Sequence, residues 1–376
     1  MKHLPSVRLP GLWQGVRWAL RRGMAGGGVS RLRLALRALN ATLWHGKMLR
    51  RWMAFIHELH SREIIRDIPG EYLRALRPHV HRATGVPDRV AQLIDHLDWT
   101  EMALQPAAFE ALVSGRPLVL AELDAPRGYD FMRIQLRRAA VNSPEGELLL
   151  TLSLRRSADV QRRAPLIDAA VLAFSRFRID GLPCMAIGGV RGQRHPVQRI
   201  SSVEIQQALQ GWKPSVLLVR VAQELARYWG LRLVGLNPAA HRLQGWTYQW
   251  KARYRGTARR IFNSYDALWE HFGASSGPEG WVVVPLSSDE KLAATALSPE
   301  KRARQIRRAD YWMRTRHLLR QRCRLLLQRP EREARLGRVT QDVERDSLAR
   351  PHDMPSGQTH ADEPSRMWES GPTSLV

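Results

Sequence analysis

Two apolar runs joined through helical segments limit the fold of this chain more than any other feature. Residues 184–193 read CMAIGGVRGQ, and residues 231–236 read LRLVGL. Between them, residues 200–209 and 214–230 have the spacing of a short and a longer helix. A strand, helix, helix, strand order places its two strands side by side with the helices packed over them. The sequence therefore predicts a neighbouring strand pair covered by helices.

The segments before this pair indicate further strands and, earlier still, helices. Residues 117–123, 129–141 and 146–156 are apolar and β-rich, with Pro and Gly in the turns between them, as in an antiparallel meander. Helical patterns precede residue 112. We expect an α+β protein, in which an N-terminal helical subdomain is followed by a mixed, largely antiparallel sheet with packed helices. The 184–236 unit has the order of acetyltransferase-like folds.

Composition shifts along the chain divide it into five parts. We expect a basic amphipathic extension over residues 1–44, a helical subdomain over 45–112 and an α+β core over 113–298. A basic helix over 299–339 and a disordered tail over 340–376 should follow.

The net charge of +24 is concentrated at the two ends of the chain. Residues 1–57 hold 11 Lys and Arg and no Asp or Glu, and residues 301–339 hold 14 against 3. Such basic segments bind anionic membrane surfaces or other polyanions. Nucleic acid is an alternative partner, although no nucleic-acid-binding motif accompanies the charge. A third reading is a helix that packs its apolar face on the core and turns its arginines to water.

Cysteine content and hydropathy indicate the compartment. The chain has two cysteines, Cys184 and Cys323, so it has no disulfide framework, and we expect a reducing environment. No apolar run reaches about 18 residues, and the N-terminus does not read as a secretory signal. We expect a cytoplasmic protein, peripheral at the inner membrane if its basic ends bind there.

Several separated motifs together resemble one bacterial family. The chain is similar to the VirK and YbjX proteins of Gram-negative bacteria over roughly residues 45–322. The motifs, in order, are EYLRALRPHV, DRVAQLIDHLDW, GELLLTLSL, AIGGVRG, LQGWKPSVLLVRVAQELARYWGL, LVGLNPAAHRL, FNSYDALWEHFG, WVVVPL and EKRARQIRRADYWMRTRHLL. The resemblance implies a role in envelope stress, antimicrobial-peptide resistance or virulence, and it implies no particular reaction. The chain departs from the family pattern at Arg191, where the family favours Gln.

The glycines at 188–192 do not form a nucleotide-binding motif, because G-x-G-x-x-G is absent and no G-K-[ST] follows. The strand and helix order leaves an acyl-CoA open as a cofactor, although the Q/R-x-x-G-x-G loop of acetyltransferases is missing. The N–H groups at a helix start bind pyrophosphate in acyltransferase-like enzymes, so Gly211, Trp212 and Lys213 are candidates, and Arg191 is a further one. The alternative is an ordinary capped helix packed on a sheet.

Candidate catalytic residues are few. His241 and Asn237 follow the predicted strand 231–236, where side chains often face a ligand, and His96 lies near Asp95 in sequence. Most such histidines pack in the core or lie at the surface. The chain has no H-E-x-x-H, and we expect no metal site.

Three functions therefore remain open at this stage. The first is a VirK-like envelope-stress and virulence factor without an established activity. The second is an acyltransferase-like enzyme that uses an acyl-CoA or an acyl carrier. The third is a nucleic-acid-associated regulator of post-transcriptional or stress responses. Whether the chain is an enzyme is left undecided.

Overall fold

The fold is described from a computed structural model. It describes residues 12–22, 28–77, 80–141, 143, 145–157, 166–192, 201–241, 265–286 and 298–328. All of these belong to one compact unit that reaches Pro330. The predicted disordered tail at 340–376 lies outside the described residues.

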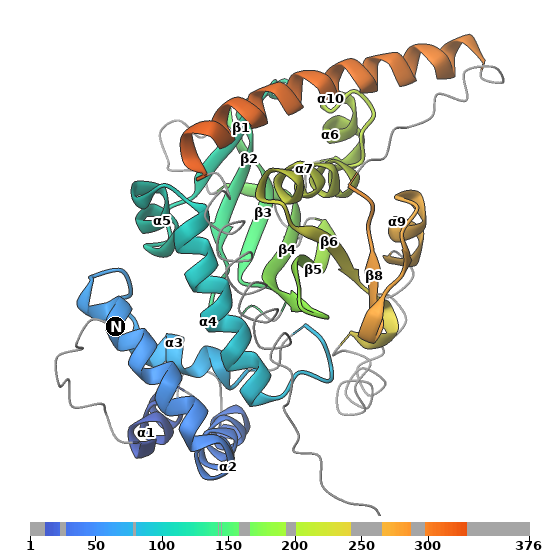
Figure 1. The fold of residues 1–376 in the computed structure, drawn as a ribbon. Helices are drawn as coiled ribbons and strands as arrows, with labels where there is room; N and C mark the ends of the chain where they lie inside the picture. The colour runs from blue at the N-terminus through green and yellow to red at the C-terminus, as the bar shows by residue number, and fades with distance from the viewer. Residues whose placement is uncertain are drawn as a thin grey trace, which may run out of the picture. The chain divides into compact units, whose positions relative to one another are not determined.

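Helices dominate the first third of the chain (Figure 1). They are α1 (Leu12–Arg22), α2 (Gly28–Ser61), α3 (Ile68–Ala75), α4 (Val86–Ala103) and α5 (Pro106–Val113). Among the described residues, α2 is the longest helix, and it is kinked at His45, where φ is −129° and ψ is 26°. The kink coincides with the predicted boundary at 44/45, although one helix runs through it.

The helical region has its own apolar contacts. Trp52 and Ile56 on α2 are fully buried, and α1 packs on α2 and α3. Trp18 of α1 meets Tyr72 of α3 edge to face, with 5.6 Å between ring centroids. The second half of α2 therefore packs in the core, as one of the three readings of the basic segments expected.

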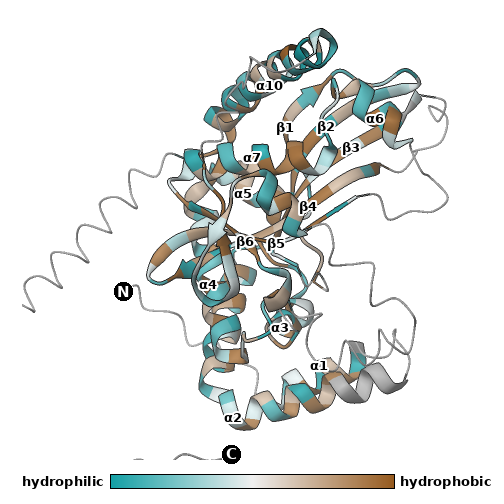
Figure 2. Ribbon diagram, turned by 90° about the vertical axis from the view of Figure 1, so that its right-hand side faces the viewer, coloured by the Kyte–Doolittle hydropathy of each residue, from teal (hydrophilic) through white to brown (hydrophobic). Residues whose placement is uncertain are grey.

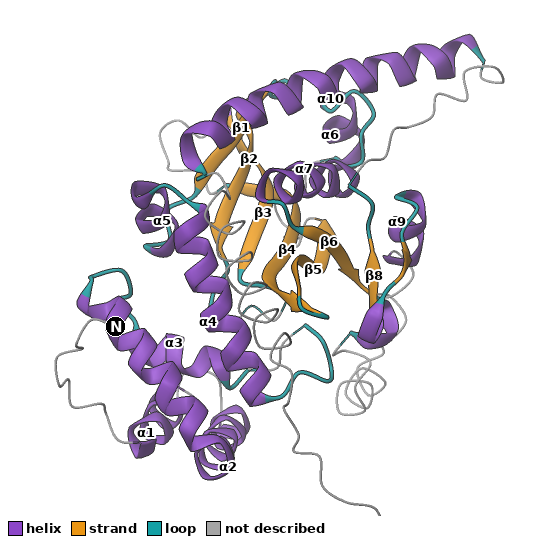
Figure 3. Cartoon of the chain, in the orientation of Figure 1, coloured by secondary structure: helices purple, strands orange, loops and turns teal. Residues whose placement is uncertain are grey.

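The described strands form one eight-stranded sheet, shown in orange in Figure 3. They are β1 (Leu118–Leu123), β2 (Tyr129–Arg138), β3 (Leu148–Arg156), β4 (Ile167–Ile179), β5 (Leu182–Gly192), β6 (Arg232–Leu236), β7 (Ser275–Ser276) and β8 (Trp281–Val283). Their spatial order is β1-β2-β3-β4-β5-β6-β8-β7. All pairs are antiparallel except β5 with β6, which is parallel. The α+β fold with a mixed, largely antiparallel sheet is confirmed, and so is the neighbouring strand pair.

The sheet is buried on both faces. In β5, Met185 and Ile187 belong to the main apolar core, whereas Cys184 and Ala186 belong to a smaller cluster with Trp281. Because successive side chains of a strand point to opposite faces, these two clusters lie on opposite sides of the sheet. Helix α4 and helix α7 (Pro214–Trp229) both pack on β4. They meet each other at Trp99 and Trp229, with 4.9 Å between ring centroids.

Helix α10 (Pro299–Leu326) runs beside β1 (Figure 1) and is largely hydrophilic in Figure 2. It is held to α7 by Glu224, whose carboxylate accepts from Arg316 at 2.7 Å and from Arg320 at 3.2 Å. Burial alone would raise the pKa of Glu224, but the hydrogen bonds from Arg316 and Arg227 outweigh burial and lower it. No described helix is both long enough and apolar enough to cross a bilayer.

Candidate functional site

The parallel pairing of β5 with β6 ends one residue before the end of β6. Their parallel pairing runs from Cys184 with Arg232 to Ile187 with Gly235 and then stops. Strand β5 continues to Gly192 on its other neighbour, β4. The opening between β5 and β6 therefore begins directly after this last pair.

A β-bulge lies at the point of separation. Ala173 of β4 faces Gly189, whereas the next residue, Phe174, faces Ile187, so Gly188 is an extra residue in β5. A Cβ on Gly188 would lie 2.2 Å from the Glu145 carbonyl oxygen and 2.5 Å from a methyl group of Val80. Position 188 therefore requires glycine because other chain segments approach its backbone closely.

Helix α9 (Tyr265–His271) supplies side chains to the opening. The Tyr265 hydroxyl donates to the Val190 carbonyl at 3.1 Å and accepts from the Val190 N–H at 3.0 Å. Trp269 Nε1 donates to the Leu236 carbonyl at 3.0 Å. The side chains of α9 thus bind backbone groups of β5 and β6 where these two strands no longer pair with each other.

A small cavity remains between these groups. It is lined by Ile187, Gly188, Leu236, Pro238, His241, Tyr265 and Trp269. Its volume of about 10 Å³ is close to the space of one water molecule. In this conformation the opening is therefore filled by Tyr265 and Trp269, and a larger ligand requires these two side chains to move.

Of the predicted catalytic residues, His241 lines this cavity and is buried. Asn237 follows β6 and caps a short 3₁₀ turn, η3 (Pro238–Ala240). Its side-chain oxygen accepts from the Ala239 N–H at 2.9 Å. The backbone of His241 forms a bridge with His81. The structure therefore brings His241 to the strand opening, whereas Asn237 shapes the turn that carries His241 there.

The predicted cofactor-binding turn lies at the start of α7, against α10. Gly211 has a φ of +91°, and a Cβ there would lie 3.7 Å from the Arg308 side chain and 3.8 Å from that of Arg304. Trp212 is buried, and its Nε1 donates to the Arg308 carbonyl at 3.0 Å. Lys213 is exposed. Three cationic side chains from α10 and this turn therefore gather at the N-terminus of α7.

Arg191, the remaining predicted cofactor residue, forms an ion pair with Glu145. It lies in β5 opposite Val171 of β4, and it does not line the cavity beside His241. The contact with Glu145 links β5 to the connection between β2 and β3.

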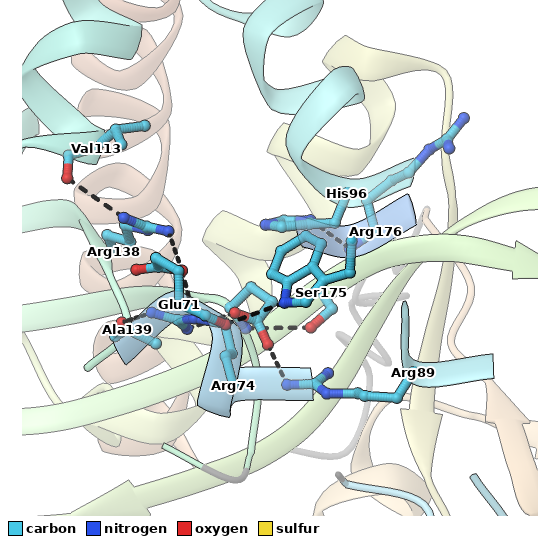
Figure 4. Close-up of polar contacts among 11 residues, drawn as sticks. Glu71, Arg74, Arg89, His96, Val113, Arg138, Ala139, Ser175 and Arg176 are labelled. Atoms are coloured by element: carbon cyan, nitrogen blue, oxygen red, sulfur yellow. Dashed lines mark hydrogen bonds and ion pairs between the residues drawn. The ribbon is translucent and has the colours of Figure 1, made fainter. Parts of the chain in front are cut away.

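His96, the third predicted catalytic residue, is buried in α4 and bonds to the sheet. Its Nδ1 accepts from the backbone N–H of Arg176 at 3.1 Å (Figure 4). Burial lowers the pKa of His96 to about 3. Its sequence neighbour Asp95 forms an ion pair with the Arg176 side chain. His96 is therefore neutral at physiological pH. Its hydrogen bond with the Arg176 N–H joins α4 to β4.

Beside His96 lies a buried ionic network, most of whose members are labelled in Figure 4. Glu147 accepts from Arg74 and from Arg89, both at 2.5 Å. Glu71 accepts from Arg74 at 3.0 Å and from Arg138 at 2.8 Å. Burial alone would lower the pKa of Arg74, but the carboxylates of Glu147 and Glu71 raise it above its ordinary value.

The network joins the helical region to the sheet, because Arg74 lies on α3, Arg89 on α4 and Arg138 on β2. Each carboxylate binds two guanidinium groups, so its charge is compensated within the protein. These ion pairs explain why Glu71 and Glu147 can be buried, and their burial requires no catalytic role.

Sequence reasoning missed Tyr265 and Trp269, which fill the strand opening. Their only sequence signal was membership of the predicted helix FNSYDALWEHFG. The expectation that the chain has no G-x-S-x-G motif is wrong, because residues 273–277, GASSG, match this pattern of hydrolases. Ser275 of that motif is exposed in the two-residue strand β7. It does not occupy the strand-to-helix turn that the hydrolase motif requires.

No group of three or more His, Cys, Asp or Glu suitable for a metal ion occurs among the described residues. Both cysteines are free and buried. Burial raises the pKa of Cys184 and raises that of Cys323 to about 12. These thiols are therefore poor nucleophiles in the folded chain.

Comparison with known proteins identifies the family. A model of the DUF535 family, described as a protein of unknown function, matches residues 28–315. No curated protein and no solved structure matches the chain. The match covers more than half of the chain, so the chain belongs to the DUF535 family.

Proposed function

We propose that this member of the DUF535 family is an acyltransferase-like protein that binds an acyl-CoA or an acyl carrier between β5 and β6. The observation that carries the proposal is that the parallel pairing ends at Ile187 and Gly235, while β5 continues to Gly192 and His241 lines the cavity beside this point. Separated parallel strands expose backbone N–H and C=O groups that an extended, amide-containing ligand can bind.

Tyr265 supports the same reading. Its hydroxyl offers one donor and one acceptor to Val190, as an amide group of the donor molecule would. We propose that the donor displaces this hydroxyl and takes over both hydrogen bonds with Val190. Because the cavity holds about 10 Å³ with Tyr265 in place, binding requires α9 to shift.

The anionic end of the donor fits the start of α7. Lys213 is exposed there, and the side chains of Arg304 and Arg308 approach Gly211. The N–H groups of the first helical turn add to this positive potential. Pro214 lacks one N–H, so the cationic side chains carry more of the interaction than in a helix without proline.

In the proposed reaction, His241 accepts a proton from an amine or hydroxyl acceptor. The acceptor then attacks the thioester carbonyl, a new amide or ester bond forms, and the carbon–sulfur bond breaks. The sulfur leaves as a thiolate and takes a proton. His241 is the described imidazole that lines the opening, which suits it for general-base catalysis.

The test is binding of CoA and of acyl-CoA thioesters to the full chain, measured by calorimetry and by thermal stabilisation. We expect Lys213→Glu to weaken binding about tenfold, the change that roughly 1.4 kcal/mol produces. Lys47→Glu, an equal charge change at an exposed site on α2, should leave binding unchanged. His241→Asn should retain binding and abolish transfer. The absence of binding by every thioester would exclude the proposal.

The cellular role that we propose rests on the resemblance to VirK and YbjX. That resemblance supports action in envelope stress, antimicrobial-peptide resistance or virulence, with acyl transfer to an envelope component as the reaction. Loss of the phenotype in a His241→Asn strain that still produces folded protein would support this assignment. An unchanged phenotype in that strain would separate the cellular role from acyl transfer.

A further inference from the structure

A second and larger cavity lies in the helical region, outside the residues of the strand opening. It has a volume of about 640 Å³, within the range of small-molecule sites. Segments from α2, from the end of α3 and from the start of α4 surround it. None of the residues that line the cavity beside His241 belongs to this site.

Helix α2 provides one wall of the cavity. The wall consists of Arg37, Asn40, Ala41, Trp44 and His45. Their spacing of three, four, seven and eight residues from Arg37 places them on one helix face. The wall ends at the kink of α2, which falls on His45. The cavity is therefore built by one face of α2 up to the kink.

The polar part of the lining includes two guanidinium groups. Arg37 and His45 come from α2, Arg77 follows α3, and Thr84 precedes α4. No Asp or Glu occurs among the described residues that line this cavity. The carboxylate of Asp88 accepts from the Gly85 N–H at 3.3 Å as part of the α4 capping box. The described part of the lining therefore offers guanidinium, imidazole and hydroxyl groups.

The remaining lining is apolar. Leu76 and Val86 contribute aliphatic side chains, and Trp44 lies at the rim with 78% of its surface exposed. Most of the apolar surface of this indole is therefore in contact with solvent and not with the rest of the protein. The neighbouring side chains Leu36 and Leu43 on α2 are exposed as well. Exposed apolar side chains of α2 thus lie near the exposed Arg37 on the same helix.

We infer that this cavity binds an amphiphile with a phosphate head group. The phosphate is held by Arg37, Arg77 and Thr84, and the apolar part of the ligand lies on Trp44, Leu76 and Val86. Guanidinium, amide and hydroxyl groups around one pocket suit a phosphate, which offers more acceptor oxygens than a carboxylate and binds guanidinium groups in a bidentate manner. The volume also exceeds what a free phosphate ion fills, which leaves room for the apolar part.

The test is calorimetric titration of the full chain with dihexanoyl phosphatidic acid below its critical micelle concentration. We expect binding, and we expect Arg37→Glu to weaken it tenfold or more, because a charge-assisted hydrogen bond contributes about 1.5–3 kcal/mol. Trp44→Ala should also weaken binding. Both side chains are exposed, so both variants should fold, and circular dichroism checks this.

The matched control is Arg50→Glu, the same charge change at an exposed site of α2 outside the cavity. It should change affinity less than twofold. Equal losses in Arg37→Glu and Arg50→Glu would show general attraction to the basic surface and would overturn the site. Absence of binding, or a response to inorganic phosphate as strong as that to the amphiphile, would overturn it too.

Two further arms identify the source of the ligand. In the first, vesicles of phosphatidylcholine with and without phosphatidic acid are sedimented with wild type and Arg37→Glu. A loss in Arg37→Glu, with Arg50→Glu unchanged, supports a membrane lipid as the ligand. The second arm is the calorimetric titration with the monomeric amphiphile. Binding in this titration without any binding to vesicles supports a soluble phosphorylated ligand. Lys213→Glu should leave both arms unchanged, which separates this site from the proposed acyl-donor site.

Discussion

Single side chains in this protein have roles that depend on partners far away in the sequence. His96 and Asp95 are adjacent in the chain and suggest a proton-transfer pair. In the structure Asp95 pairs with Arg176, and His96 accepts from the backbone of Arg176, 80 positions along. The residue type was visible in the sequence, but the partner was not, because it depends on how α4 crosses β4.

The neutral state of His96 predicts a pH dependence of stability. Its folded pKa of about 3 lies below its unfolded value of 6.5, so between these pH values only the unfolded chain binds the proton. The free energy of unfolding should therefore fall by about 1.4 kcal/mol for each pH unit of acidification in that window. Urea unfolding at pH 7, 6 and 5 measures it.

The control for this pH prediction is His96→Asn. The asparagine side chain keeps an acceptor for the Arg176 N–H but does not titrate. This variant should lose the contribution of His96 to the pH slope, whatever its stability at pH 7. An identical slope in wild type and variant would mean that His96 does not cause the acid sensitivity.

The candidate site could be predicted in part at the residue scale. His241 was predicted as a candidate because it follows a buried strand, and the structure places it at the strand opening. Tyr265 could not be found in this way, because its importance comes from two hydrogen bonds with Val190, 75 residues earlier. Pairing over such distances depends on the path of the chain and not on local pattern.

Among the elements, the strands were more predictable than the way they pair. Apolar runs bounded by Pro and Gly predicted β1, β2, β3, β5 and β6 with small errors at their ends. The bulge at Gly188 was not predicted, because a bulge is a property of two strands in register. The sequence thus identifies the CMAIGGVRGQ segment as a strand, but only the structure explains why its glycines are needed.

The glycines of β5 provide a matched test of this bulge. Gly188→Ala places a Cβ against the Glu145 carbonyl oxygen and Val80. We expect it to lower the free energy of unfolding by about 1–3 kcal/mol, the usual cost of overpacking. Gly192→Ala in the same strand meets nothing within 4 Å, and its effect should be within about 0.5 kcal/mol. Denaturant unfolding of both variants measures the difference, and equal effects would contradict the close approach at Gly188.

At the scale of the whole molecule, α10 packs on β1 and is held to α7 through Glu224. Its residues Tyr311, Leu319 and Cys323 are buried. The chain after α10 also meets the helical region, because Gln105 N–H donates to the Leu326 carbonyl at 2.9 Å and Leu327 forms a bridge with Leu104. This basic helix was predicted from its arginines, but its packing on β1 and α7 was not, because arginine-rich patterns alone indicate a solvated helix.

Truncation should show that α10 is part of the compact unit. A chain that ends at Ser298 loses Arg316 and Arg320, which bind the buried carboxylate of Glu224. We expect it to lose at least about 3 kcal/mol of stability, because a buried charge is left with too few partners. A chain that ends at Pro330 retains these contacts and should unfold at the wild-type temperature. Thermal unfolding followed by circular dichroism compares the two, and equal midpoints would contradict the role of α10.

The ionic network around Glu147 also bears on the time course of synthesis. A ribosome releases Arg74 and Arg89 before their shared partner, because Glu147 follows them by 73 and 58 residues. Until Glu147 emerges, Arg89 cannot form its ion pair with Glu147, and Arg74 has Glu71 as a partner but lacks its second carboxylate. The first helices should therefore stay loosely associated during translation and reach their final packing when the connection between β2 and β3 arrives.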